Sequence, residues 1–193
     1  MATSTPDVGV EKNVFESTIG GITVNGKAHS LSAWFVLSLR LLFGYAFLHA
    51  GWTKMSWVAG ESFDAQGYLL HAVPDASPLV GMFTWMGSTA WFVDFVNVAV
   101  PYGELFIGLG LIVGAFVRLA AFFGATMMLL FYFGNWSVEH GVVNSDLAYA
   151  LVFLAIAAFG AGRILGLDAL IERYEVGGQP LVERYPRLRY VLG

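Results

Sequence analysis

Apolar residues divide this chain into long hydrophobic stretches separated by polar connections. A helix needs ~20 predominantly apolar residues to cross a bilayer. Four stretches approach that length: Leu31–Lys54, Phe95–Val117, Leu119–Trp136 and Leu147–Gly162. The pattern therefore predicts an all-α membrane protein built on a four-transmembrane-helix bundle.

The long connection Met55–Asp94 has its own pattern. Its second half, Leu79–Phe92, is apolar but too short to span, and it contains Trp85 and Trp91. Because tryptophan prefers the headgroup level of a membrane, we expect an external interfacial or re-entrant helix over the mouth of the bundle. The alternative is a ragged start of the second span.

The regions outside the spans are an N-terminal arm (1–30), ahead of the membrane domain (31–166), and a C-terminal tail (167–193). Within the tail, Leu167–Tyr174 has the pattern of a short amphipathic helix that ends at Gly-Gly-Gln-Pro. The final segment, LVERYPRLRYVLG, suits anionic lipid or a protein partner. Acidic residues precede the first apolar stretch, which predicts no cleavable signal peptide.

Composition agrees with a lipid bilayer as the first partner. Hydrophobic residues make up 57% of the 193 residues and charged residues only 12%, against about 25% in soluble domains. The net charge of −4 argues against nucleic acid as a partner. The chain has no cysteine, which excludes disulfides, thiol catalysis and cysteine-ligated iron–sulfur clusters. Any electrons would pass through a bound cofactor, a quinone or a partner.

Cationic residues are distributed unevenly. Eight of the ten lie on the side of the termini: Lys12, Lys27, Arg118, Arg163, Arg173, Arg184, Arg187 and Arg189. Lys54 alone lies on the other side, and we place Arg118 in the short turn between spans two and three. The positive-inside rule predicts a multi-pass plasma-membrane protein with both termini in the cytoplasm.

Arg40 and Glu104 are the ionisable residues near the middle of spans one and two. Helical spacing puts each on a stripe that also carries glycines, with Lys54 on the stripe of Arg40. At 1.5 Å per residue, Arg40 lies roughly 14 Å and Glu104 roughly 21 Å from the cytoplasmic ends, so the two could pair. Such a pair fixes helix register only, or forms the charged floor of a cavity.

Other polar candidates lie toward the external end. His49 could bind a quinone carbonyl or relay a proton, although it lies off the Arg40 stripe and a packing role is the alternative. Tyr102, Asn135 and Trp136 are further candidates, the last two in the aromatic run FYFGNW, which suits a quinone head group or the ordinary membrane interface. Only His49 lies within a span, so no haem is expected, although His140 leaves that question open. No metal-ligand spacing or dinucleotide fingerprint occurs, so we expect no metal or nucleotide.

Three motifs together resemble the DoxX/DoxD family of four-helix membrane proteins. They are LSLRLLFGYAFLHAGWTKM, YGELFIGLGLIVGAFVRLAA and YALVFLAIAAFGAGRILGLD. Five residues occupy the family's recurrent polar positions: Arg40, Lys54, Glu104, Arg118 and Arg163. The long first loop is similar to the DoxD branch, the membrane subunit of a thiosulfate:quinone oxidoreductase.

The resemblance implies a quinone-linked redox subunit with a second small subunit as partner; a homo-oligomer is the alternative assembly. On this hypothesis Glu104, Lys54 and Arg40 are the catalytic candidates. The cofactor-binding candidates are His49, Tyr102, Asn135 and Trp136. Two other functions stay open: a non-catalytic scaffold of a larger membrane complex, and a carrier of small solutes or lipids.

Overall fold

A computed structural model describes residues 14–19, 21–27, 29, 31–136 and 142–193, which divide into two units between Phe35 and Val36. The first unit contains an antiparallel hairpin of β1 (Val14–Ile19) and β2 (Ile22–Lys27). The all-α prediction is wrong for this arm. Its strands are rich in β-branched residues, which favour extended backbone, and Gly21 turns between them with φ of 83°.

Four apolar helices form the bundle of the second unit. They are α1 (Ser32–Thr53, which begins in the first unit), α4 (Ala90–Val113), α5 (Val117–Gly134) and α6 (Ser145–Ala158). In the described part of the chain, three of them are long and apolar enough to cross a membrane. Helix α6 has 14 residues, about 21 Å, so the fourth span stays a prediction. Arg118 is the second residue of α5 rather than part of the turn before it.

Glycine and phenylalanine bring these helices into close contact. A Cβ at Gly108 of α4 would lie 2.6 Å from Leu48 Cα of α1, so the two backbones touch there. A Cβ at Gly124 of α5 would collide with the ring of Phe153 from α6. That fully buried ring also packs edge-on against Phe47 of α1, with centroids 4.9 Å apart. Close packing of small residues is how membrane helices associate, because lipid offers them no hydrophobic driving force.

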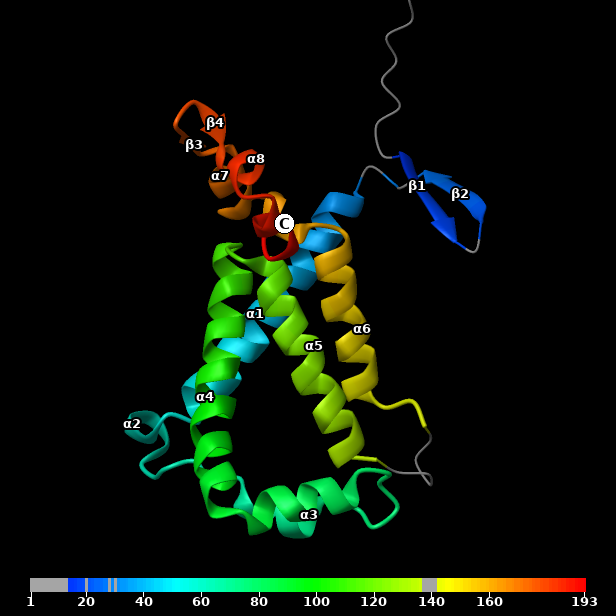
Figure 1. The fold of residues 1–193 in the computed structure, drawn as a ribbon. Helices are drawn as coiled ribbons and strands as arrows, with labels where there is room; N and C mark the ends of the chain where they lie inside the picture. Colours follow the sequence, from blue (N-terminus) through cyan, green and yellow to red (C-terminus); the bar gives the residue numbers. More distant parts are fainter. Residues whose placement is uncertain (1–13, 20, 28, 30, 137–141) are drawn as a thin grey trace, which may run out of the picture. The chain divides into compact units, whose positions relative to one another are not determined.

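Helices α4 and α5 diverge instead. A turn at 114–116 joins them, and Figure 1 shows them separating away from that turn, with α3 (Val80–Ser88) running across their far ends. Extended backbone at Thr89 separates α3 from α4, so α3 is a helix of its own and not a ragged start of the second span. Its position at the membrane interface stays a prediction.

Short elements complete the second unit. Before α3 they are α2 (Ser56–Ala59) and the π-helix η1 (Tyr68–Ala72). After α6 they are η2 (Ala161–Arg163), α7 (Asp168–Arg173), β3 (Glu175–Val176), β4 (Gln179–Pro180), α8 (Leu181–Arg184) and η3 (Pro186–Tyr190). Helix α7 confirms the short helix predicted in the tail. The Gly177-Gly178 break forms the turn of a second hairpin, β3–β4, which the sequence did not predict.

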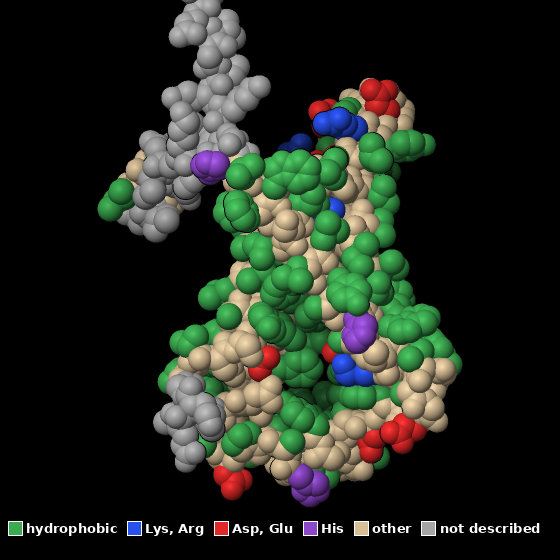
Figure 2. All heavy atoms as spheres, turned by 180° about the vertical axis from the view of Figure 1, so that it is seen from behind, with side chains coloured by type: hydrophobic (Ala, Val, Ile, Leu, Met, Phe, Trp, Pro, Cys, Tyr) green, Lys and Arg blue, Asp and Glu red, His purple; other side chains and the backbone are tan. Residues whose placement is uncertain are grey.

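The second unit has two hydrophobic cores and an apolar surface. The larger core joins the four long helices around Phe153, and the smaller one lies under α3 around Phe83. Outward-facing side chains such as Leu42 and Phe122 are each 61% exposed. In Figure 2, hydrophobic side chains cover most of the helical surface, with charged ones concentrated toward its two ends. Helices with such a surface are typical of a protein surrounded by lipid.

Candidate functional site

A cavity of about 1150 Å³ lies between the diverging helices α4 and α5. Along α4 it extends from Phe92 to Val113, about 30 Å at the helical rise, which is the thickness of a bilayer's hydrocarbon core. The polar residues that line it are Lys54, Asp64, Tyr68, Thr126 and Asn135. All but Thr126 belong to the end covered by α3. The cavity is therefore amphipathic, with a polar end near α3 and apolar walls toward the turn.

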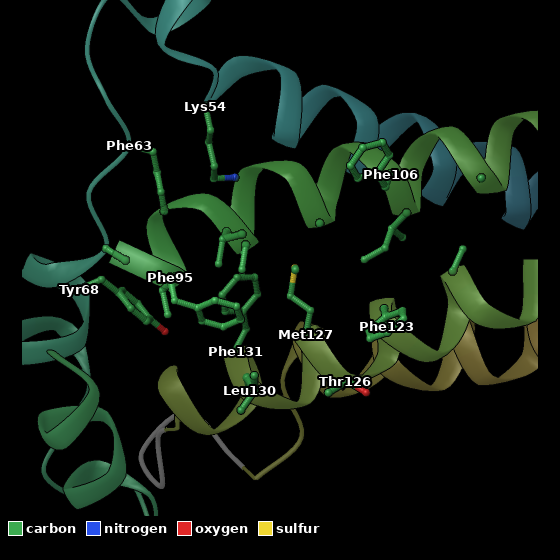
Figure 3. A pocket seen from close by; sticks show the side chains of 18 of the residues that line it. Lys54, Phe63, Tyr68, Phe95, Phe106, Phe123, Thr126, Met127, Leu130 and Phe131 are labelled. Atoms are coloured by element: carbon green, nitrogen blue, oxygen red, sulfur yellow. The ribbon is translucent and has the colours of Figure 1, made fainter. Parts of the chain in front are cut away.

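An ion pair forms the main charged feature of the polar end. Lys54 Nζ lies 2.7 Å from Glu104 Oε2 and also donates to the Ala50 carbonyl at 3.3 Å. Figure 3 shows the Lys54 side chain extending into the cavity from the end of α1. These two bonds use two of the three ammonium hydrogens, and a bound ligand could accept the third. Pairing lowers the cost of holding either charge at membrane depth.

Lys54 also borders a second, smaller pocket of about 390 Å³, which shares Phe63 and Asp64 with the large cavity. Glu61 and Ser62, both exposed, line this pocket, so it faces water rather than lipid. The Lys54 side chain is 29% exposed, whereas that of Glu104 is 6% exposed. The lysine therefore lies between an aqueous pocket and an apolar cavity, and the carboxylate is covered.

A chain of polar side chains reaches the same cavity from other elements. The Tyr68 hydroxyl of η1 donates to Asn135 Oδ1 at 3.0 Å, and Asn135 Nδ2 donates to Asp146 Oδ2 at 2.8 Å. Burial, followed by the nearby Asp146 charge, raises the pKa of Tyr68, so its hydroxyl keeps its proton at neutral pH. These bonds also connect the segment beneath α3 to α5 and α6.

Arg40 does not pair with Glu104, and that prediction is wrong. Its guanidinium donates to three carbonyls of the α6–α7 connection: Ala161 at 2.6 Å, Ile164 at 2.7 Å and Leu165 at 3.3 Å. Arg40 is 1% exposed and lies level with Gly114, in the turn after α4. It lines neither of the two pockets described above. Its position and contacts favour a structural role over the catalytic one.

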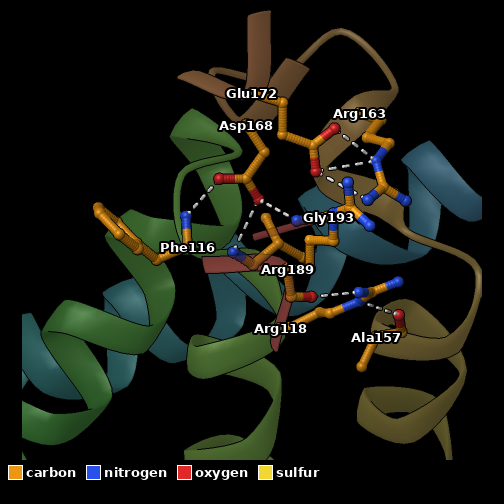
Figure 4. Close-up of polar contacts among 9 residues, drawn as sticks. Phe116, Arg118, Ala157, Arg163, Asp168, Glu172, Arg189 and Gly193 are labelled. Carbon is orange, nitrogen blue, oxygen red and sulfur yellow. Dashed lines mark hydrogen bonds and ion pairs between the residues drawn. The ribbon is translucent and has the colours of Figure 1, made fainter. Parts of the chain in front are cut away.

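Asp168 joins Arg40 in fixing this end of the bundle. The carboxylate is fully buried and accepts backbone N–H groups from Phe116 at 2.7 Å, Val117 at 3.0 Å and Gly193 at 3.0 Å (Figure 4). It therefore caps α5, whose preceding residue, Phe116, adopts a left-handed backbone with φ of 53°. It also fixes the end of the tail against the chain's own bundle.

Arg118 and Arg163, two further family positions, also form polar contacts at the Arg40 end of the bundle. Arg118 donates to the carbonyls of Ala157 and Arg189, and Arg163 forms a 2.7 Å ion pair with Glu172. The hydrogen bond from Arg163 lowers the pKa of the Glu172 carboxyl. Of the five recurrent polar positions, only Lys54 therefore lines the cavity, and Glu104 lies behind it as its ion-pair partner.

The cofactor-binding candidates from the sequence also divide into residues that line the cavity and residues that do not. Asn135 lines the cavity, as the cofactor-binding hypothesis requires. His49 is exposed beside Tyr45, whereas Tyr102 and Trp136 lie outside the set of lining residues. His140 lies outside the described residues. Sequence reasoning missed Tyr68, Asp64 and Asp146, which lie in connections or at a helix start and carry no periodic signal.

Fold and site together define an α-helical membrane protein with an amphipathic cavity between two of its helices, whose polar part lies at one end. The DoxX family model matches residues 35–140, more than half of the chain, and the chain therefore belongs to the DoxX family. This confirms the family that the motifs indicated. The matched range ends before α6, so Asp168 and its motif lie beyond it. Neither a curated protein nor a solved structure matches the chain.

Proposed function

We propose that this protein is the quinone-binding membrane subunit of a redox enzyme. The head group binds at Lys54, whose ammonium Glu104 holds in place, and the apolar tail follows the cavity between α4 and α5. The observation that carries the proposal is the Lys54–Glu104 pair, 2.7 Å apart, at the polar end of a cavity as long as the bilayer core is thick. A molecule with a compact polar head and a long apolar tail matches this distribution of polarity.

The two charged residues have distinct tasks in this proposal. A quinone supplies two-electron, two-proton chemistry when it is bound. Lys54 donates its third N–H to a ring oxygen and places a positive charge where negative charge develops. Glu104 does not line the cavity and its Oε2 accepts from Lys54 Nζ, so it positions the ammonium and exchanges a proton with the ligand through Lys54.

The resemblance to the DoxD branch extends the proposal to thiosulfate as the electron donor. The aqueous pocket beside Lys54 is lined by Glu61 and Asp64, whose negative charges repel a dianion. We therefore place oxidation of the donor on a partner subunit and only the quinone side of the reaction on this chain.

Quinone binding is the direct test. Purified protein in nanodiscs is titrated with a decyl-tailed 1,4-benzoquinone, and affinity is read by calorimetry. Lys54→Met and Glu104→Gln should each weaken binding about tenfold, which corresponds to the loss of one charge-assisted hydrogen bond. Arg173→Met and Glu175→Gln change exposed residues at the Arg40 end and should leave affinity unchanged. Circular dichroism checks the fold, and unchanged affinity in both site variants overturns the proposal.

An accessory role is the second candidate, and the open side of the cavity favours it. Phe106 of α4 and Phe123 of α5 line the cavity yet remain 63% and 53% exposed, so a helix of another membrane subunit could cover them. Wild-type protein that binds no quinone, alone or with a partner supplied, would favour this role.

A further inference from the structure

The polar end of the cavity has two groups of polar side chains that come from different elements. Lys54 directly follows α1 and Glu104 belongs to α4, whereas Tyr68, Asn135 and Asp146 come from η1, the end of α5 and the start of α6. Lys54, Tyr68 and Asn135 all line the same cavity. Figure 3 shows Tyr68 reaching it from a different segment than Lys54, with Phe95 and Phe131 also at this end. A flat ring that binds there would meet polar groups from both sets.

The hydrogen bonds fix which way the Asn135 amide points. The oxygen faces the Tyr68 hydroxyl, which donates to it, and the nitrogen faces the Asp146 carboxylate, which accepts from it. A flipped amide would place two acceptors together at Asp146, so the observed orientation is preferred. An amide nitrogen carries two hydrogens, and the bond to Asp146 uses one of them.

We propose that Asn135 donates its other N–H to a second carbonyl oxygen of the ligand. The site would then select rings that carry two carbonyl groups at opposite positions. This inference rests on the proposed quinone function and narrows it to para-quinones. Lys54 contacts one carbonyl oxygen of the quinone, and Asn135 contacts the other. Tyr68 and Asp146 are positioning residues, because the Tyr68 hydroxyl donates its hydrogen to the amide oxygen, and Asp146, which lies outside the cavity lining, accepts from the amide nitrogen.

Two probes separate this claim from simple cavity binding. One is the decyl-tailed 1,4-benzoquinone, and the other is a decyl-tailed cyclohexenone, which has a single ring oxygen. Asn135→Ala should weaken binding of the benzoquinone about tenfold, the value of one hydrogen bond, and that of the cyclohexenone less than twofold. Lys54→Met should weaken both probes. Thr84→Val is the matched control and should leave both affinities unchanged, because its hydroxyl donates to the Val80 carbonyl of its own helix and lies outside the cavity lining.

Variants of the positioning residues Tyr68 and Asp146 should change the two affinities in a pattern of their own. Tyr68→Phe and Asp146→Asn should each weaken binding of the benzoquinone about threefold and leave binding of the cyclohexenone unchanged. Each variant removes one hydrogen bond that orients the Asn135 amide but leaves the amide itself in place. If Tyr68 and Asp146 only stabilised the fold, their variants would weaken binding of both probes equally, and that result overturns the proposal. Thermal melts confirm that each variant folds.

The outcomes also separate the two proposals. If Lys54→Met weakens binding but Asn135→Ala affects neither probe, the two-oxygen site is wrong and the quinone function stands. If wild-type protein binds neither probe, both proposals are wrong.

Discussion

At the scale of single residues, α1 carries two cations with different surroundings. Lys54 ends the helix beside a carboxylate and an aqueous pocket, whereas Arg40 is buried among backbone carbonyls. A lysine ammonium is a compact charge that can redirect one hydrogen to a ligand. A guanidinium presents a rigid fork of donors that suits several fixed carbonyls at once. The residue types therefore fit their sites, a ligand contact for Lys54 and a structural clamp for Arg40.

The partners of these residues predict their energetic coupling. Lys54→Met strands Glu104 at depth and Glu104→Gln strands Lys54, so the double variant should lose less stability than the sum of the single losses. The coupling should be about 1–2 kcal/mol, below the value for a fully buried pair because Lys54 is partly exposed. Arg40→Met combined with Glu104→Gln should be additive within about 0.5 kcal/mol. Denaturant unfolding in detergent measures both cycles, and coupling confined to the Arg40 cycle would contradict this assignment.

At the scale of elements, the sequence predicted the long helices and their buried stripes well. Arg40, Gly44, Phe47 and Gly51 are all buried on α1, as their spacing requires. The relative height of two helices was harder to predict. Counting from the helix ends assumed that the cytoplasmic ends of the spans lie level, yet Arg40 lies beside Gly114, in the turn beyond the end of α4. That offset brings Glu104 to Lys54 instead, because only tertiary packing sets the register of two helices.

The sequence predicted only those site residues that interrupt or adjoin an apolar stretch. Lys54, Glu104 and Asn135 lie in or next to apolar stretches, where a polar residue is conspicuous. Tyr68 and Asp146 lie among other polar residues, so nothing in the sequence distinguishes them. Packing of η1 against α3 brings Tyr68 to the cavity, and packing of α6 against α5 brings Asp146 to Asn135.

The close contact of α1 with α4 can be tested with two glycines of one helix. Gly108→Ala would place a methyl group against the Leu48 backbone, which cannot yield without separating the helices, and should cost about 1–3 kcal/mol. Gly103→Ala meets only the flexible Met127 methyl group at 3.3 Å and gains helix propensity, so its stability should be unchanged or slightly higher. Thermal unfolding of the two variants gives the comparison, and equal losses would contradict the packing described above.

At the scale of the whole molecule, the two ends of the second unit differ in function. The Arg40 end holds the turns and the tail together through buried polar contacts, with Asp168 at their centre (Figure 4). The Lys54 end keeps its helices apart and its polar groups beside a cavity. Firm closure at one end allows α4 and α5 to diverge at the other, because the turn at 114–116 is fixed in place. The buried polar contacts and the polar end of the cavity thereby lie at opposite ends of one bundle.

This division predicts how the protein lies in the membrane. In the second unit, six cationic residues lie at the Arg40 end (Arg118, Arg163, Arg173, Arg184, Arg187 and Arg189) and Lys54 lies at the other end, so the positive-inside rule predicts the Arg40 end in the cytoplasm and the Lys54 end outside. The chain has no cysteine, so Asp75→Cys before α3 and Arg187→Cys in the tail give single labels at exposed positions. A membrane-impermeant maleimide should label position 75 in intact cells and position 187 only after permeabilisation. The reverse pattern would contradict the orientation and place the proposed quinone head-group site on the cytoplasmic side.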